Sequence, residues 1–243
     1  MDVWQETVAV TLGDVDSSNR VKPSAFFAYF QHATTLHGDD LGIGAGTIAE
    51  VGQGWVLSRF SVEIEKRPAM SETLTLRTWP RGFKKLFAIR DYELIDGSGG
   101  LVARARSGWL VIDIHKRRPL REESLHTKLP ANDAMPDMIP GGPFQLGELA
   151  GMEKAGEKTA SYSDTDYNGH VNNVRYIEWL EDCIGLDRML AASKISININ
   201  YVNELLPGQT VGLFKQSDGS RTAVMAQRQE DGQCVFRAEM CIQ

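Results

Sequence analysis

The sequence predicts an α+β protein built from two copies of one unit, each a long helix followed by an antiparallel sheet. Three observations support this prediction. An acidic turn followed by an apolar, helix-like run occurs twice, and each run continues into strand-like segments separated by turn-forming residues. A segment rich in Pro, Gly and Ala lies between the two copies.

A constant shift in residue number relates the two copies. The segment around Asp16 aligns with the segment around Asp166 at a shift of 166 − 16 = 150 residues. The same shift aligns Asp14 with Asp164, Val21 with Val171, and Tyr29 with Trp179. Self-similarity at a fixed spacing indicates a duplicated structural unit.

The two helices are expected over residues 23–36 and 172–186, where apolar residues recur with helical spacing. Pro23 suits the first turn of the first helix, because its fixed φ is compatible with a helix start. Asn172 or Asn173 suits the N-cap of the second helix, because a short amide side chain accepts a hydrogen bond from a free helical N–H.

Strand-like segments follow each helix. In the first copy they are expected over residues 60–67, 72–79, 86–95 and 101–114. In the second copy they are expected over residues 194–202, 210–214, 222–229 and 234–242. A shift of 210 − 73 = 137 aligns the two sets. A helix followed by an antiparallel meander, present twice, predicts a tandem double hot-dog, in which a curved sheet wraps a long helix in each half.

The domain boundaries are expected to lie on either side of the Pro- and Gly-rich segment. This segment has no sustained strand alternation, which is typical of a linker. We therefore expect an N-terminal domain over residues 1–126, a linker over 127–154 and a C-terminal domain over 155–243.

Composition excludes several classes of protein. The net charge of −6 argues against a general nucleic-acid binder, which needs a clustered basic surface. The three cysteines have no spacing that suggests a disulfide framework or a metal site, and no cofactor is implied. The chain has no run of about 18 apolar residues and begins without a secretory signal pattern. It is therefore expected to be cytoplasmic and not inserted in a membrane.

A polar motif immediately precedes the second helix. Asp166, Asn168 and His170 alternate in the string DYNGHVNN, and Glu204 follows the next predicted strand. Taken alone, Asp166 and Asn168 are also compatible with a simple turn and helix cap. A carboxylate, an amide and an imidazole held together are, however, the groups that general acid–base catalysis uses.

The motif resembles the active site of plant-type acyl-acyl-carrier-protein (acyl-ACP) thioesterases. The resemblance covers DYNGHVNNVRYIEW and NYVNELLPGQ, and extends to residues 20–44 and 55–68 of the first copy. It implies hydrolysis of a fatty acyl thioester carried on the phosphopantetheine arm of an acyl carrier protein. Plant members commonly carry Cys after the catalytic Glu, whereas this chain has Leu205, so a cysteine nucleophile is excluded there and water attack is favoured.

The resemblance assigns candidate roles to the four polar residues. Glu204 is the favoured general base, with Asp166 sharing the activation of water; Asp166 can also orient the other groups electrostatically or serve as the base itself. Asn168 is expected to position the water or the thioester, and His170 to donate a hydrogen bond or move a proton.

Two further features extend the site. Backbone N–H groups at Val171 and Asn172 are expected to form an oxyanion site at the start of the helix. The first copy lacks three of the four polar groups, since it carries Ser18 for Asn168, Arg20 for His170 and Arg67 for Glu204. We therefore expect catalysis in the second domain only, with the first domain shaping the acyl pocket.

Basic residues gather in two turns of the first copy. The candidate carrier-binding residues are Arg81, Lys84, Lys85, Lys116, Arg117 and Arg118. Such clusters attract an acidic carrier or the phosphate of its arm, although solvated strand ends explain them equally well.

Other functions fit the same fold. They are an acyl-CoA thioesterase, a hot-dog dehydratase or hydratase, and a non-catalytic acyl-binding protein. A homodimer is also compatible with the sequence.

Overall fold

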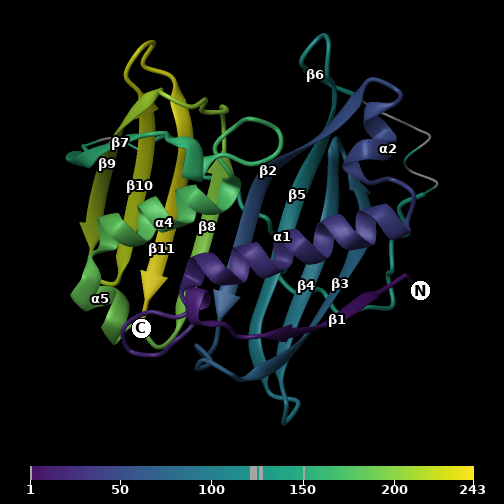
Figure 1. Ribbon diagram of the computed structural model, residues 1–243, viewed down its shortest axis with the longest axis horizontal. Helices are drawn as coiled ribbons and strands as arrows, with labels where there is room; N and C mark the ends of the chain where they lie inside the picture. The colour runs from purple at the N-terminus through teal and green to yellow at the C-terminus, as the bar shows by residue number, and fades with distance from the viewer. Residues whose placement is uncertain (1, 121–124, 126–127, 150) are drawn as a thin grey trace.

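The computed structural model describes residues 2–120, 125, 128–149 and 151–243 (Figure 1). Eleven strands in this part of the chain form one antiparallel sheet in the order β1-β3-β4-β5-β2-β8-β11-β10-β9-β7, and β6 pairs with β5 outside this path. Both long helices cross the same face of the sheet (Figure 1). The predicted α+β architecture, with one long helix and a set of antiparallel strands in each half, is confirmed, and the strands of the two halves join in a single sheet.

The first half supplies six strands and the second half five. The strands of the first half are β1 (Trp4–Ala9), β2 (Gln53–Ile64), β3 (Thr73–Lys84), β4 (Phe87–Asp96), β5 (Leu101–Asp113) and β6 (Arg118–Pro119). Those of the second half are β7 (Glu153–Thr159), β8 (Ile195–Tyr201), β9 (Thr210–Asp218), β10 (Arg221–Arg228) and β11 (Cys234–Ile242). The helices are α1 (Pro23–Asp40), α2 (Ala45–Ala49), α4 (Asn173–Ile184) and α5 (Leu186–Ala191), with short 3₁₀ turns at Leu12–Asp14 and Tyr162–Asp164.

The two halves meet through the antiparallel pair β2 and β8. Ser61 lies opposite Asn198 in this pair, and the shift of 61 + 137 = 198 makes these two residues equivalent in the repeat. Equivalent residues face one another only where a local two-fold axis passes between the halves. The junction therefore has the geometry of a symmetric dimer interface within a single chain.

The core lies between the sheet and the helices. In the first half, Phe27, Phe30, Phe60 and Tyr92 form a buried aromatic cluster with ring centroids 4.9–6.1 Å apart. Burying each such side chain contributes about 1.5–3 kcal/mol, so this cluster is a principal anchor of α1 on the sheet.

The two helices begin in different ways. The Asn172 side chain caps α4 by accepting the Val174 N–H at 2.9 Å, as expected for one of the two predicted cap residues. No side chain of its own segment caps α1; instead, Glu181 of α4 accepts the Ser24 N–H at 2.6 Å and the Ser24 hydroxyl at 3.1 Å. Burial raises the pKa of Glu181 to about 7 despite these hydrogen bonds. The second half thus caps the first helix of the first half.

Several elements differ from the predicted ones. Helix α1 continues to Asp40, β2 begins at Gln53, and α2 and the edge strands β1 and β7 were not predicted. Strand β7 begins inside the predicted linker. Its residues, EKAGEKT, show no apolar alternation, so only pairing with β9 makes this segment a strand.

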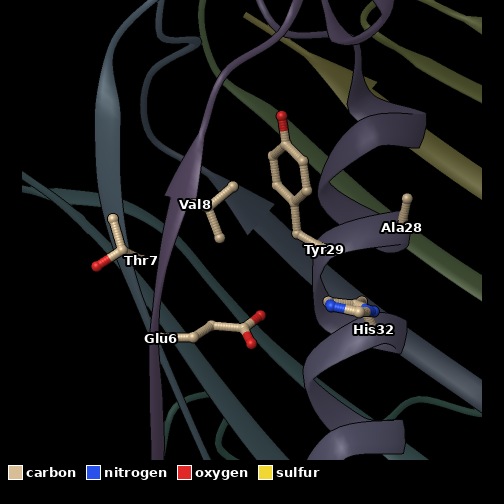
Figure 2. A pocket seen from close by; sticks show the side chains of 6 residues that line it. All are labelled: Glu6, Thr7, Val8, Ala28, Tyr29 and His32. Carbon is tan, nitrogen blue, oxygen red and sulfur yellow. The ribbon is translucent and has the colours of Figure 1, made fainter.

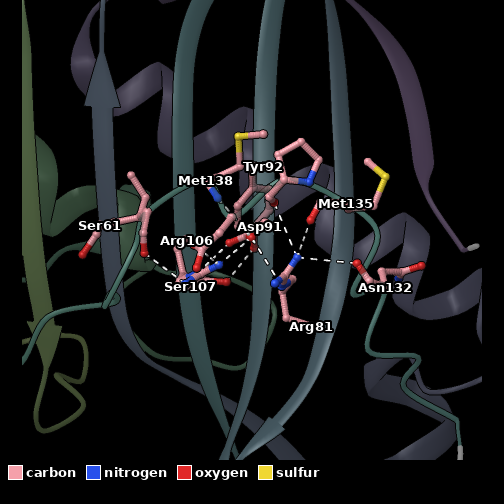
Figure 3. Close-up of polar contacts among 12 residues, drawn as sticks. Ser61, Arg81, Asp91, Tyr92, Arg106, Ser107, Asn132, Met135 and Met138 are labelled. Atoms are coloured by element: carbon pink, nitrogen blue, oxygen red, sulfur yellow. Dashed lines mark hydrogen bonds and ion pairs between the residues drawn. The ribbon is translucent and has the colours of Figure 1, made fainter.

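The linker is bound to the outer face of the first half. Figure 3 shows Asp91, on the face of β4 that points away from α1, facing Arg81 and Arg106 beneath the linker. The Arg106 guanidinium donates to both oxygens of the fully buried Asp91 at 2.6 Å and to the Ile139 carbonyl at 3.0 Å. Arg81 donates to the Met135 carbonyl at 2.8 Å.

The linker also contacts the junction between the halves. The Asn200 side chain accepts the Leu146 N–H at 2.7 Å and donates to the Phe144 carbonyl at 2.9 Å. The Ser61 hydroxyl accepts the Phe144 N–H at 3.2 Å. Where the linker is described it is therefore a fixed strap rather than a free tether. Among the described residues, no helix has the length and apolar character needed to cross a membrane.

Candidate active site

The polar motif lies in a tight turn that leads into α4. The Asp166 N–H donates to the His170 carbonyl at 3.0 Å, and the Gly169 N–H donates back to the Asp166 carbonyl at 3.0 Å. Gly169 has φ of 76°, in the left-handed region that glycine adopts without a steric penalty. The turn is joined to the Glu204 segment because the Val171 N–H donates to the Leu205 carbonyl at 2.9 Å.

The structure brings His170 and Glu204 together. His170 Nε2 lies 3.3 Å from Glu204 Oε2, and both side chains are about one third exposed, at 38% and 31%. This exposure keeps the pair open to water and substrate. Asp166 lies in the same turn, where its carboxylate accepts the Asn168 N–H at 2.9 Å. The Asn168 residue is exposed.

Arg117 completes the surroundings of Glu204. Its guanidinium forms an ion pair with Glu204 Oε1. Arg117 lies in the turn between β5 and β6, so it comes from the first half, whereas Glu204 follows β8 in the second half. The site is therefore composite. This residue was predicted to bind the carrier, and the sequence contains no signal for its contact with Glu204.

The predicted oxyanion donors are not available. The Val171 N–H is used by the Leu205 carbonyl, and the Asn172 N–H donates to the Asp164 carbonyl at 2.8 Å. The prediction for these two amides was wrong, because the turn uses both of them to join its own ends and the neighbouring segment. Among the described residues, no acceptor contacts the backbone N–H of His170 or of Asn173.

Two neighbours of the His170–Glu204 pair, Tyr176 and Arg228, were not among the predicted site residues. Burial raises the pKa of Tyr176, and the nearby charges of Asp166 and Glu204 raise it further. Tyr176 therefore lies beneath the site as a neutral phenol. Arg228 donates to the Glu204 carbonyl at 3.1 Å and fixes the backbone of that residue. The position of Tyr176 one turn after the motif was the only signal for its proximity.

The other basic residues divide into two groups. Lys84 and Lys85 are exposed in the β3–β4 turn, and Lys116 and Arg118 are exposed around the β5–β6 turn. Both turns lie at the same end of the sheet, because the start of β4 pairs with the last residues of β5. Arg81 is excluded from this surface, since its guanidinium contacts the buried Asp91 and the linker.

The equivalent site in the first half is a structural ion pair. Arg67, at the position of Glu204, contacts the Asp16 carboxylate and donates to the Val21 and Met189 carbonyls at 2.8 Å each. Burial of Asp16 raises its pKa, but hydrogen bonds from Ser18 and Arg67 outweigh this and hold it below the ordinary value. Met189 lies on α5, so this pair links the first half to the second.

All three cysteines are free, and burial raises the pKa of Cys183 to about 11, which keeps it a protonated thiol. Leu205 is fully buried. Within the described ranges, no group of three His, Cys, Asp or Glu side chains is placed to hold a metal ion.

A separate groove of about 340 Å³ lies between β1 and α1 (Figure 2). Its lining residues are Glu6, Thr7, Val8, Ala28, Tyr29 and His32. Strand β1 is at the outer edge of the sheet, four strands away from β2 at the junction. The groove is therefore distinct from the Glu204 site.

Comparison with known proteins gives a consistent result along the chain. Residues 1–124 match the family model for the acyl-ACP thioesterase N-terminal domain, and residues 151–240 match the model for the C-terminal domain. The dodecanoyl-[acyl-carrier-protein] hydrolase of Cinnamomum camphora is 26% identical over 75% of this chain and 51% of its own length. Oleoyl-acyl carrier protein thioesterase 2 of Arabidopsis thaliana is 26% identical over 93% of this chain and 64% of its own length. The chain thus spans about half to two thirds of these relatives.

Solved structures show the same fold. An acyl-ACP thioesterase from Bacteroides thetaiotaomicron superposes with a TM-score of 0.89 at 25% identity, covering 100% of this chain and 98% of its own. The 12:0-ACP thioesterase of Umbellularia californica superposes with a TM-score of 0.84 at 22% identity, covering 99% of this chain and 97% of its own. The similarity extends over both halves and the strap between them.

Proposed function

This chain belongs to the acyl-ACP thioesterase family, and on that premise we propose that it hydrolyses fatty acyl thioesters held on an acyl carrier protein. The observation that carries the proposal is the pairing of His170 with Glu204 at the start of α4. A carboxylate beside an imidazole, both open to solvent, is suited to activating water for attack on an acyl group.

The first chemical step is addition of water to the thioester carbonyl. Glu204 takes one proton from the water molecule while the water oxygen bonds to the carbonyl carbon. This addition gives a tetrahedral oxyanion. Asp166 supports this step electrostatically and Asn168 positions the water or the thioester. The unused N–H groups of His170 and Asn173 are the donors proposed for the oxyanion in place of Val171 and Asn172.

The second step breaks the carbon–sulfur bond. As the oxyanion collapses, the electron pair of that bond leaves with sulfur, and the thiolate receives the proton that Glu204 took from water, passed through His170, so that both side chains return to their starting states. The products are the fatty acid and the carrier with a free thiol. Water thus supplies the oxygen and the protons, and no covalent enzyme intermediate is formed.

The test is hydrolysis of an acyl-ACP panel, with release of free thiol as the readout. We expect Glu204→Gln to lower kcat by roughly a hundredfold to ten-thousandfold, because it removes the proton acceptor. The matched control is Glu148→Gln, which makes the same charge change at an exposed linker residue. Equal activity of both variants would refute the assigned role of Glu204. Faster hydrolysis of acyl-CoA than of acyl-ACP would favour an acyl-CoA thioesterase.

Carrier binding is proposed for the exposed basic turns. This carrier-binding surface consists of Lys84, Lys85, Lys116, Arg117 and Arg118. All of these residues lie at the end of the sheet from which Arg117 reaches Glu204. Opposite charge on an acidic carrier would therefore guide the thioester toward the catalytic carboxylate.

A homodimer remains a proposal that rests on the sheet edges. Strands β1 and β7 end the strand order, so each pairs on one side only within the described part of the chain. Light scattering at increasing protein concentration tests this; a constant monomer mass would exclude it.

A further inference from the structure

We propose that Arg117 is a latch that holds Glu204 until the phosphodiester of the substrate's prosthetic arm draws the guanidinium away. This inference rests on the proposed function, because it assumes that Glu204 activates water and that the acyl group arrives on a phosphopantetheine arm. Arg117 is then a positioning residue that couples substrate binding to release of the catalytic carboxylate.

The latch occupies the Glu204 carboxylate, which is the group that must react. Glu204 Oε1 contacts the Arg117 guanidinium, and Glu204 Oε2 faces His170 Nε2 at 3.3 Å. With a guanidinium on one carboxylate oxygen and an imidazole facing the other, neither oxygen is open to an incoming water. Because Arg228 holds the Glu204 backbone, the change needed for reaction is confined to side chains.

The contact between Arg117 and Glu204 is easy to release. The Arg117 side chain is 65% exposed and that of Glu204 is 31% exposed. An ion pair this open to water is weak, since solvent screens it and both long side chains lose freedom to form it. Arginine binds a phosphate oxygen pair through two parallel N–H bonds, which makes phosphate an effective competitor for the guanidinium.

The turn between β5 and β6 holds its own backbone by hydrogen bonds and leaves the Arg117 side chain exposed. The Arg117 N–H donates to the Asp113 carbonyl at 2.8 Å, and the Asp113 carboxylate accepts the N–H groups of His115 and Lys116 at 2.9 Å each. Arg117 itself has φ of 53°, in the left-handed region. The backbone of the turn is therefore fixed, and the exposed side chain is the part that can move.

The basic residues around Arg117 favour an anion as the competitor for its guanidinium. Lys116 and Arg118 flank Arg117, and Lys84 and Lys85 lie in the neighbouring turn at the same end of the sheet. Across the described chain, Arg118, Lys84 and Lys85 have no ion-pair partner. These free cations favour an incoming phosphate at the position where Arg117 can leave Glu204 for it.

The experiment compares three substrates with the same acyl group. They are the acyl carrier protein thioester, the CoA thioester, and the N-acetylcysteamine thioester, which has no phosphate. The variants are Arg117→Ala, Arg117→Lys and the matched control Arg104→Ala, which removes a partly exposed arginine that pairs with Glu63 outside the carrier-binding surface. Steady-state kcat and KM are measured for each pair, and thermal unfolding confirms that the variants are folded.

The latch predicts effects of opposite sign. Arg117→Ala should raise kcat on the phosphate-free thioester by about two- to fivefold, the size of a weak surface ion pair. It should raise KM for the two phosphate-bearing substrates. Arg117→Lys should restore most of the wild-type kcat on the phosphate-free thioester, whereas Arg104→Ala should leave that kcat unchanged.

The results that overturn the latch are distinct from those that overturn the function. If Arg117→Ala lowers kcat on the phosphate-free thioester, or leaves that kcat unchanged, then Arg117 does not restrain Glu204. A KM change confined to the carrier-protein substrate would assign the contact to the carrier surface and reject the phosphate. Failure of the wild-type protein to hydrolyse acyl-ACP would instead reject the proposed function.

Discussion

The ion pair in the first half gives a quantitative test of how that half has diverged. Replacing Arg67 with Met keeps a long side chain but removes the charge and all of its hydrogen bonds. The Arg67 side chain is 1% exposed and that of Asp16 is 14% exposed, so the variant leaves Asp16 largely shielded from water without its cation. Removing one partner of a buried pair costs about 3–5 kcal/mol of unfolding free energy.

This cost in unfolding free energy includes the loss of the hydrogen bonds that Arg67 donates to backbone carbonyls. The carbonyls of Val21 and Met189 each lose a 2.8 Å hydrogen bond, and every such unsatisfied buried acceptor costs about 1–3 kcal/mol within that total. In a domain of this size, 1 kcal/mol shifts the melting temperature by about 2–4 °C. We therefore expect Arg67→Met to melt about 6–20 °C below the wild type.

Urea unfolding monitored by tryptophan fluorescence measures the loss. The matched control is Arg20→Met, at an exposed position of the same turn, which should change the unfolding free energy by no more than about 0.5 kcal/mol. Hydrolysis by folded Arg67→Met should keep the wild-type kcat, because within the described chain Arg67 shares no hydrogen-bond or ion-pair partner with Glu204. A loss below about 1 kcal/mol, or a loss equal to that of the control, would refute the structural role of this pair.

Three further predictions concern pH, carrier binding and the nucleophile. Because burial raises the pKa of Glu181 from 4.5 to about 7, its contribution to stability is full below about pH 4.5 and is lost as pH rises through 7; Glu181→Gln should flatten the melting temperature between pH 5 and 8, and an unchanged slope would contradict this. Reversing the charges of Lys84 and Lys85 should raise KM for acyl-ACP several-fold, and added salt should mimic the effect on the wild type; a KM insensitive to both treatments would assign these lysines to solvation alone. Replacing all three cysteines with Ser should leave kcat largely intact, and an acyl group trapped on any cysteine or serine in a rapid quench would reject water attack.

The sequence was sufficient to predict the duplicated architecture because the repeat carries its own internal check. The shift of 150 relates both turns and the shift of 137 relates the strands, so a wrong assignment in one half conflicts with the other. Edge strands escaped prediction because β7 contains almost no apolar residues, and its conformation comes from hydrogen bonds to β9. Local propensity does not contain that pairing.

The candidate site was predicted only in part, for reasons of distance along the chain. The proximity of His170 and Glu204 followed from the resemblance of their two separate segments to the thioesterase family. The contact of Arg117 with Glu204 crosses 204 − 117 = 87 residues, and no periodic pattern reports such a contact. The amides of Val171 and Asn172 were assigned to the oxyanion because helix starts usually leave N–H groups free. Here a local turn and a neighbouring carbonyl use both.

Assignment of the basic residues failed where charge was buried. Arg81 belongs by composition to the same cluster as Lys84 and Lys85, yet it faces the buried Asp91 under the strap. Alternation along β3 places successive side chains on opposite faces, and the sequence does not reveal which face a later linker will cover. A cluster of charged residues in the sequence therefore predicts a surface patch only when the segments that cover each face of the sheet are known.

The two-fold axis between Ser61 and Asn198 has a consequence for how such a protein can change over evolutionary time. In a dimer of identical chains, every substitution occurs at both related positions, so a buried arginine and a partly exposed glutamate cannot occupy equivalent sites. Joining the two units in one chain removes that constraint, and residues 67 and 204 are free to differ. Glu204, the proposed base, lies in one unit, whereas its counterpart Arg67 contacts Asp16 and Met189 and so holds the two units together. A single chain can therefore carry a proposed reactive group at one position and a structural contact at the equivalent position of the other unit.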